Sequence, residues 1–277
     1  MSKIELIKRF RANIDTKAIW VWQADTILQA DFISNLVFEK ITLVFIPYSS
    51  KAVSNEKYQE FITNCHNSHI DVFALHGESD WVTSNAATSF TRINDVINFN
   101  TINPRARFDG IHLDVEPQSL TEWKTGDRAK IIRDWINLSE QWIELAHMNN
   151  LEIGASFPYW INNQVSSPTP DGRELDEIML EMYDHYAIMA YSTDYLKTVE
   201  WSKRVVSLNA ARKVFPSLEV SFQAGNISLF YNDFFEIERM IDAIDQHFNN
   251  EEGYAGVAIH DYNEYARRIR QYRLKKV

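Results

Sequence analysis

The chain has 277 residues and a formal net charge of −10, from 28 Lys and Arg against 38 Asp and Glu, so its length allows one large domain or two small ones. The acidic balance argues against nucleic acid or an anionic membrane surface as a partner, because both attract clustered Lys and Arg. A single cysteine, Cys65, excludes an internal disulfide and a cysteine-based zinc site. The chain shows neither a membrane-spanning apolar stretch nor a signal-peptide pattern, so we expect a cytoplasmic protein without a membrane partner.

Eight short apolar runs recur along the chain, and longer amphipathic segments separate them. The runs span residues 18–22, 41–47, 70–76, 108–115, 152–157, 186–191, 218–223 and 254–260. They have strand length and are rich in Val, Ile and Phe, whereas the segments between them repeat apolar residues every three or four positions. This alternation predicts a single α/β domain over residues 1–277, a (β/α)₈ TIM barrel. An open doubly wound sheet would show a Gly-rich turn after the first strand, which WVWQADT lacks.

The N-terminal segment precedes the first predicted strand. Apolar residues at Ile4, Leu6, Ile7 and Phe10 predict a short helix that caps the floor of the barrel.

The fourth run, FDGIHLDVEP, carries three ionisable residues in succession on one side. Because side chains alternate along a strand, His112, Asp114 and Glu116 point into the barrel, while Ile111 and its neighbours of the same parity pack outward. In TIM barrels, residues at the C-terminal ends of strands carry the chemistry. Asp114 and Glu116 are about 7 Å apart along a strand, so like-charge coupling is expected to raise one pKa. Glu116, nearer the rim, is the better general acid.

Other strand ends add candidate ligand-binding side chains. The inward or rim positions named for this role are Trp22, Tyr48, His76, Glu78, Trp81, His112, Trp160, Met189, Tyr191, Gln223 and His260. Four aromatic residues at four different strand ends fit a carbohydrate ligand, since sugar rings stack on aromatic faces while their hydroxyl groups need carboxylates, amides and phenols.

Two motifs resemble those of the family 18 glycoside hydrolases, the chitinase-like (β/α)₈ barrels. DGIHLDVE resembles the family signature DGxDxDxE and keeps Asp109, Gly110, Asp114 and Glu116. The sixth run, AIMAYS, resembles the Met-x-Tyr-Asp motif and keeps Met189 and Tyr191. The last run, GVAIHDYN, resembles the closing strand of the family.

The resemblance implies a role for each catalytic residue. Glu116 would be the general acid, Asp114 would orient the 2-acetamido group whose oxygen attacks the anomeric carbon, and Tyr191 would support that step. The reaction would need no cofactor and no metal. Three positions depart from the family pattern: His112 replaces the middle Asp, where it offers a hydrogen bond to Asp114, Ser192 replaces an Asp, and His260 replaces the Trp that forms the floor of the sugar site.

Three functions remain open from the sequence. The first is a glycoside hydrolase acting on an amino-sugar or related oligosaccharide. The second is a metal-dependent hydrolase built on inward His and carboxylate side chains, although no short metal motif such as HExxH is present. The third is a non-catalytic, chitinase-like carbohydrate-binding protein. No feature of the sequence identifies an oligomeric interface.

Overall fold

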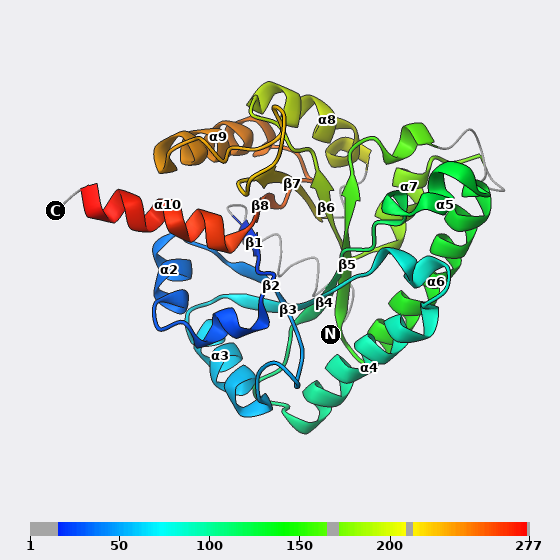
Figure 1. Cartoon of the computed structure of the whole chain (residues 1–277), viewed down its shortest axis with the longest axis horizontal. Coiled ribbons are helices and arrows are strands. Elements are labelled where there is room, and N and C mark those ends of the chain that lie inside the picture. Colours follow the sequence, from blue (N-terminus) through cyan, green and yellow to red (C-terminus); the bar gives the residue numbers. More distant parts are fainter. Residues whose placement is uncertain (1–15, 165–171, 209–212, 276–277) are drawn as a thin grey trace.

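The computed structural model describes residues 16–164, 172–208 and 213–275, and the predicted N-terminal capping helix lies outside them. Eight parallel strands form a closed barrel in sequence order, and β1 completes it by pairing with β8 through Ala18 and Ala258. Figure 1 shows the strands at the centre and the helices around them. The predicted TIM barrel is therefore confirmed.

The strands are β1 Thr16–Trp20, β2 Leu43–Pro47, β3 Asp71–His76, β4 Gly110–Leu113, β5 Glu152–Pro158, β6 His185–Met189, β7 Lys213–Glu219 and β8 Gly256–His260. The α-helices are α2 Phe32–Phe38, α3 Asn55–Asn67, α4 Ala86–Ile102, α5 Thr121–Thr125, α6 Arg128–Met148, α7 Leu175–Met182, α8 Tyr195–Leu208, α9 Phe234–Phe248 and α10 Tyr262–Lys275.

Local sequence explains where the long helices begin and which face they bury. The Asp127 side chain accepts a hydrogen bond from the backbone N–H of Lys130 at 2.9 Å and caps α6. Asp233 and Glu236 form a reciprocal capping box at the start of α9. Along α9, buried side chains from Ile237 to Phe248 recur every three or four residues, so one face of the helix covers the barrel.

Alternation along the strands separates two apolar layers. The inner layer fills the barrel and is made of Ala18, Trp20, Leu43, Phe45, Phe73, Leu75, Ala187, Phe215, Ala255 and Ala258. Residues of the opposite parity, such as Ile19 and Ile111, pack outward against the helices. The interior is therefore a packed core below the rim.

The seventh strand corrects the sequence-based prediction. It spans Lys213–Glu219 and not 218–223, because Val214, Phe215 and Pro216 pair with β6 and the chain leaves the sheet after Glu219. The following residues form a loop that turns at Gly225, whose φ is +89°. The strand-like alternation beyond Glu219 is therefore a loop sequence.

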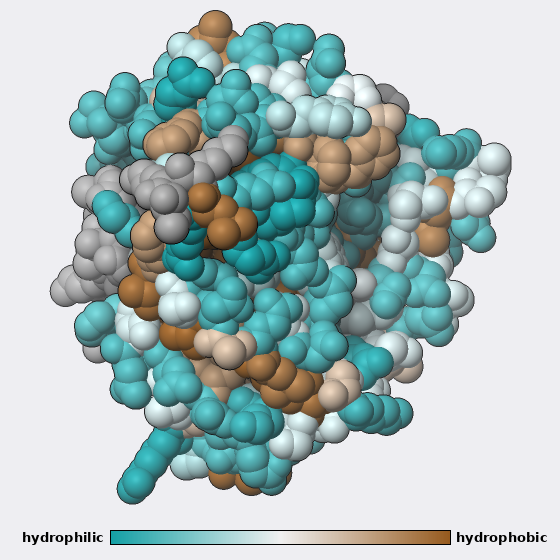
Figure 2. Space-filling model, turned by 60° about the vertical axis from the view of Figure 1, so that its left-hand side comes forward, coloured by the Kyte–Doolittle hydropathy of each residue, from teal (hydrophilic) through white to brown (hydrophobic). Residues whose placement is uncertain are grey.

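Among the described residues, none of the helices has both the length and the apolar character needed to cross a bilayer. The face shown in Figure 2 is mainly hydrophilic, and its hydrophobic atoms form separate patches.

Candidate active site

Asp114 and Glu116 directly follow β4 at the C-terminal rim. The backbone N–H of Asp114 donates to the carbonyl oxygen of His76 at 2.8 Å, which ties the end of β4 to β3. Gln118 Nε2 donates to Glu116 Oε1 at 2.9 Å. The Asp114 Oδ1 atom is buried and has no hydrogen-bond partner among the described residues. Burying a carboxyl oxygen without a hydrogen-bond partner costs free energy. Asp114 Oδ1 can therefore still accept a hydrogen bond.

The two carboxyl groups differ from ordinary surface acids in their pKa. Burial and the charge of Asp114 raise the pKa of Glu116 to about 7. Burial raises the pKa of Asp114 too, while His260 and the Ser156 hydroxyl oppose that effect. Glu116 is therefore partly protonated near neutral pH, as a general acid must be.

A chain of buried polar side chains lies below Asp114. His112 Nε2 is 2.8 Å from Ser156 Oγ, and His112 Nδ1 is 2.8 Å from His185 Nε2. Burial lowers the pKa of His112 well below its usual value and that of His185 to about 4, so both rings are neutral at pH 7. Phe45 stacks on His112 with ring centroids 3.9 Å apart. The expected inward direction of His112 is confirmed.

Two consequences follow for the position where the motif departs from the family signature. The expected direct hydrogen bond from His112 to Asp114 is wrong, because both ring nitrogens are occupied by Ser156 and His185. Ser156 instead contacts both His112 and Asp114. Gly154 makes room for this arrangement, since a Cβ there would lie 2.1 Å from the His185 ring. Only glycine fits at position 154 while His185 keeps its place.

His260, Glu219 and Trp22 form a second polar group on the opposite strands. His260 Nδ1 is 2.8 Å from Glu219 Oε2, and Trp22 Nε1 donates to His260 Nε2 at 2.7 Å. An indole N–H only donates, so Nε2 is the accepting nitrogen and the imidazole proton lies on Nδ1, facing Glu219. Burial lowers the pKa of His260, but the hydrogen bond and charge of Glu219 outweigh burial and raise it overall.

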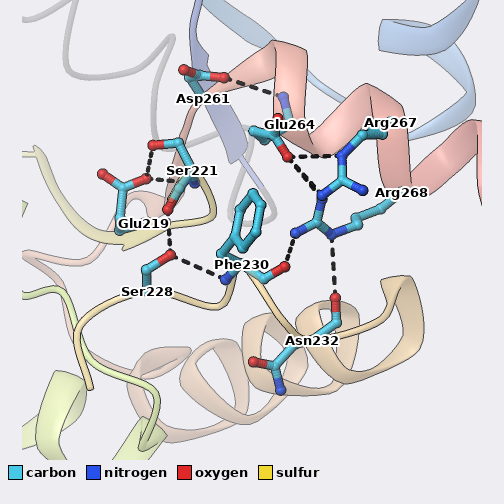
Figure 3. A network of polar contacts seen from close by, with 9 residues as sticks. All are labelled: Glu219, Ser221, Ser228, Phe230, Asn232, Asp261, Glu264, Arg267 and Arg268. Atoms are coloured by element: carbon cyan, nitrogen blue, oxygen red, sulfur yellow. Dashed lines mark hydrogen bonds and ion pairs between the residues drawn. The ribbon is translucent and has the colours of Figure 1, made fainter. Parts of the chain in front are cut away.

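A hydrogen-bonded loop holds Glu219 in place. Its Oε1 accepts from the backbone N–H of Ser221 at 2.7 Å and from the Ser221 hydroxyl, and Ser228 donates to the Ser221 carbonyl. Figure 3 shows that Arg268 of α10 ties the same loop down through the carbonyl oxygens of Phe230 and Asn232. The position of Glu219 therefore depends on both β7 and the last helix.

Tyr191 follows β6 and completes the group around the acids. Its ring centroid is 6.0 Å from that of His260. Burial and the charges of Asp114, Glu219 and Glu116 raise its pKa well above the usual value. The phenol therefore stays protonated and can donate a hydrogen bond, with the charges of three carboxyl groups around it.

Five of the predicted binding residues surround one cavity beside the acids. The cavity has a volume of about 290 Å³ and includes Trp22, Tyr48, His76, Glu78 and Trp81 in its walls. The predicted inward direction of His76 is wrong, since it shares the parity of Val72 and Ala74, which pack toward the helices. His76 reaches this cavity from the outer layer of the barrel.

The walls of this cavity do not include three other predicted residues, Met189, Trp160 and Gln223. Met189 is the last residue of β6, and Trp160 is half-buried in the turn after β5. Gln223, predicted to point inward from β7, is exposed in the loop that follows the strand. The side chains that sequence reasoning left out of the site are Ser156, His185 and Arg92. Inward parity marks the first two, because each lies on a strand two residues from an interior position.

A raised carboxyl pKa alone does not mark the site. Burial and Glu238 raise the pKa of Glu39 to about 7 as well. Glu39 accepts a hydrogen bond from Tyr265 at 3.1 Å, and Lys17 pairs with Glu238 at 3.0 Å, near the start of β1. That group lies at the opposite end of the barrel from the rim and has a structural role.

The His and carboxyl side chains considered for a metal site do not form a ligand set within the described part of the chain. Among the residues that the structure describes, no group of three or more His, Cys, Asp or Glu side chains could hold a metal ion. His112 is engaged with Ser156 and His185, while His76 lies toward α4. The site geometry therefore gives no support to the metal-dependent alternative.

Comparison with solved structures shows the fold. No protein-family model and no curated protein sequence matches the chain. A GH18 chitinase from Pseudoalteromonas aurantia superposes with a TM-score of 0.62 at 14% identity, covering 93% of this chain and 99% of the other. A chitinase from Bacteroides thetaiotaomicron gives 0.59 at 11% identity over 90% of both chains. A family 18 N-acetylglucosaminidase from Paenibacillus barengoltzii gives 0.58 at 11% identity, covering 92% and 97%. The chain thus has the fold of GH18 chitinases and chitinase-like enzymes over more than 90% of its length.

Proposed function

We propose that this protein is a glycoside hydrolase that cleaves an amino-sugar oligosaccharide or polysaccharide. The observation that carries the proposal is Glu116 at the barrel rim, with a pKa raised to about 7 by burial and by the neighbouring Asp114. A carboxylic acid that keeps its proton near neutral pH is what protonation of a glycosidic oxygen requires. The chitinase fold of the neighbouring structures supports the same class of substrate.

In the proposed reaction, Glu116 gives its proton to the glycosidic oxygen as the bond to the anomeric carbon breaks. The acetamido oxygen of the same sugar forms the new bond to that carbon, so no protein nucleophile is needed. Asp114 orients the acetamido N–H, and the Tyr191 hydroxyl supports the acetamido oxygen. Water then attacks the anomeric carbon, Glu116 takes up its proton, and the configuration is retained.

The neutral histidine below Asp114 changes one feature of this scheme. In the family pattern a second carboxyl group occupies position 112, and it would share a proton with Asp114. Here the Ser156 hydroxyl lies between Asp114 and a neutral His112, so Asp114 faces no second negative charge from below. Asp114 can ionise as the acetamido group develops positive charge, and the Ser156 hydroxyl can donate to the resulting carboxylate.

The test compares three proteins on N-acetylglucosamine oligomers: wild type, Glu116→Gln and Glu122→Gln. Glu122 is the matched control, because it is an exposed glutamate on α5 of the same loop. We expect wild type and Glu122→Gln to cleave equally and Glu116→Gln to lose about 10²- to 10⁴-fold in turnover. Equal turnover by Glu116→Gln would overturn the assignment of the acid. Binding by wild type without any cleavage would favour a carbohydrate-binding protein instead.

A further inference from the structure

Two adjoining cavities lie at the ends of β2 and β3 and reach α4. The first, of about 290 Å³, includes Trp22, Gly77 and Trp81, and the second, of about 280 Å³, includes Lys51, Thr91 and Asp95. They share four lining residues, Tyr48, Ser49, Thr88 and Arg92. Together they offer space for about one sugar unit and a substituent.

Direct contacts connect this double cavity to the acids. The His76 carbonyl accepts the backbone N–H of Asp114, and a Cβ on Gly77 would lie 2.2 Å from the Asp114 carbonyl oxygen. On the other side, Trp22 lines the cavity and donates to His260. The wall of the double cavity is therefore joined to the strand end that carries Asp114, and we infer that a sugar in the cavity is next to the sugar whose bond Glu116 protonates.

Arg92 is the main cation of the double cavity and has few partners. Its side chain is 46% exposed, and its described ion pair is with Asp95 at 4.0 Å, which is too long for a hydrogen bond. No hydrogen bond of the Arg92 guanidinium occurs among the described residues. A guanidinium carries five N–H donors in a planar fork that matches a carboxylate.

Two more polar atoms at the first cavity lack partners. Trp81 is 1% exposed and its Nε1–H has no acceptor among the described residues. His76 Nε2 is buried without a partner, and burial together with the charge of Arg92 lowers the pKa of His76 to about 3, so the ring is neutral. An indole N–H requires an acceptor oxygen, which a buried water or a ligand supplies.

The acidic residues of the walls leave Arg92 available. Glu78 is exposed on the rim, and Lys51 lies in the second cavity with Asp95. Asp95 is 4.0 Å from Arg92, so it does not occupy the guanidinium donors. The hydroxyl groups of Ser49, Thr88 and Thr91 complete walls that are rich in sugar-binding groups.

We propose that the double cavity binds a sugar unit that carries a carboxylate, with Arg92 paired to that carboxylate. The inference rests on the proposed glycoside hydrolase function and names the class of substrate: an acidic amino-sugar oligosaccharide. Trp22 and Tyr48 supply aromatic faces for the sugar ring, and the carboxylate satisfies the guanidinium in a way that a neutral hydroxyl group does not.

The test compares kcat/KM on three oligosaccharides of equal length. One is neutral N-acetylglucosamine oligomer, one carries a lactyl ether carboxylate on alternate amino sugars, and one carries uronic acid units. Wild type is expected to prefer one or both acidic substrates by 10- to 100-fold, as a charge-assisted hydrogen bond of about 1.5–3 kcal/mol implies. The acidic substrate that wild type prefers shows whether the recognised carboxylate belongs to a lactyl ether or to a uronic acid.

The variants are Arg92→Gln and, as a matched control, Arg105→Gln, which changes an exposed arginine beyond the other end of α4. Arg92→Gln should remove the preference, because kcat/KM should fall about 10- to 100-fold on the preferred acidic substrate and by a smaller factor on the neutral oligomer. Arg105→Gln should retain the preference for acidic substrates. Equal kcat/KM on all substrates for wild type, or an equal loss on all substrates for Arg92→Gln, would overturn the proposal.

If wild type cleaves none of the substrates, the proposed function fails. Calorimetric measurement of oligosaccharide binding then tests the acidic-sugar site on its own. Tighter binding of an acidic oligomer by wild type than by Arg92→Gln would retain the acidic-sugar site. Equal binding of neutral and acidic oligomers by both proteins would remove it.

Discussion

The two sides of the barrel rim differ in how their polar groups are satisfied. On the side of β4 to β8, most polar side chains contact one another: Ser156 and His185 hydrogen-bond His112, Glu219 pairs with His260, and Arg268 holds the loop of Glu219, while Asp114 Oδ1 has no partner among the described residues. On the side of β2 and β3, Trp81 Nε1 and His76 Nε2 have no partner, and Arg92 has a long contact with Asp95.

This difference distinguishes two tasks. Groups that carry out chemistry work best when they are held in place before the substrate arrives. Groups that recognise a ligand keep donors free until the ligand supplies acceptors. The connected side therefore fits the proposed reaction, and the unconnected side fits the proposed binding of an acidic sugar.

The largest expected effect is a difference in the free energy of unfolding between variants of two arginines, one from each side of the barrel rim. Arg268 is 3% exposed and donates to Glu264, Phe230 and Asn232, so Arg268→Gln should lower the free energy of unfolding by about 3 kcal/mol. Arg92→Gln should change it by less than about 0.5 kcal/mol. Urea denaturation of both variants measures the difference. Equal losses would mean that Arg92 is as connected as Arg268.

A second change affects the boundary between the two sides. A Cβ on Gly77 would lie 2.2 Å from a backbone oxygen of Asp114, so Gly77→Ala must push the ends of β3 and β4 apart. We expect a loss of about 2 kcal/mol in stability and at least a tenfold loss of turnover. Gly172→Ala is the control for alanine at a position with open space, although its positive φ adds some strain. Full turnover in Gly77→Ala would show that the two sides are mechanically independent.

The pH dependence gives a third and smaller effect. Because the reaction needs protonated Glu116 and its pKa is raised to about 7, kcat/KM should fall as the pH rises above about 7. Gln118 hydrogen-bonds the ionised form, so Gln118→Leu should move that fall to higher pH. A profile that stays flat from pH 6 to 9 would contradict the role of Glu116.

The same pKa has a consequence for stability. The pKa of Glu116 is about 7 in the folded chain against an ordinary value of 4.5, so the folded state binds more protons and wild-type stability falls between pH 4.5 and 7. Glu116→Gln removes this loss and should be more stable than wild type at pH 8 by about 1–2 kcal/mol, after allowance for solvent screening, with no gain at pH 4. Urea denaturation at both pH values measures the effect.

The sequence predicted the architecture and the centre of the candidate site because both depend on local periodicity. Alternation placed His112, Asp114 and Glu116 on one side of β4, and the repeated strand-helix pattern predicted the barrel. The strand prediction failed at β7, where Pro216 and the alternation beyond Glu219 obscured the true bounds of the strand. Strand boundaries depend on pairing with neighbours, which a single segment does not contain.

The contacts between strands could not be predicted in the same way. The partners of His112 come from β5 and β6, and Arg92 reaches the cavity from α4. Parity identified inward positions on each strand, but the height and register of each strand in the barrel decide which of those positions meet. His76 shows the limit, since an error of one position in parity reverses its direction.

The hydrogen bond from Trp22 to His260 joins residues 238 positions apart, on either side of the β1–β8 seam. A ribosome must therefore add every residue up to His260 before this corner of the site can form. A truncated or partly synthesised chain that lacks β8 keeps Asp114 and Glu116 but leaves Trp22 and Glu219 without their common partner. Any activity of the kind proposed would appear only after β8 has been made and the barrel has closed, and contacts between distant segments of a chain are among the slower ones to form in folding.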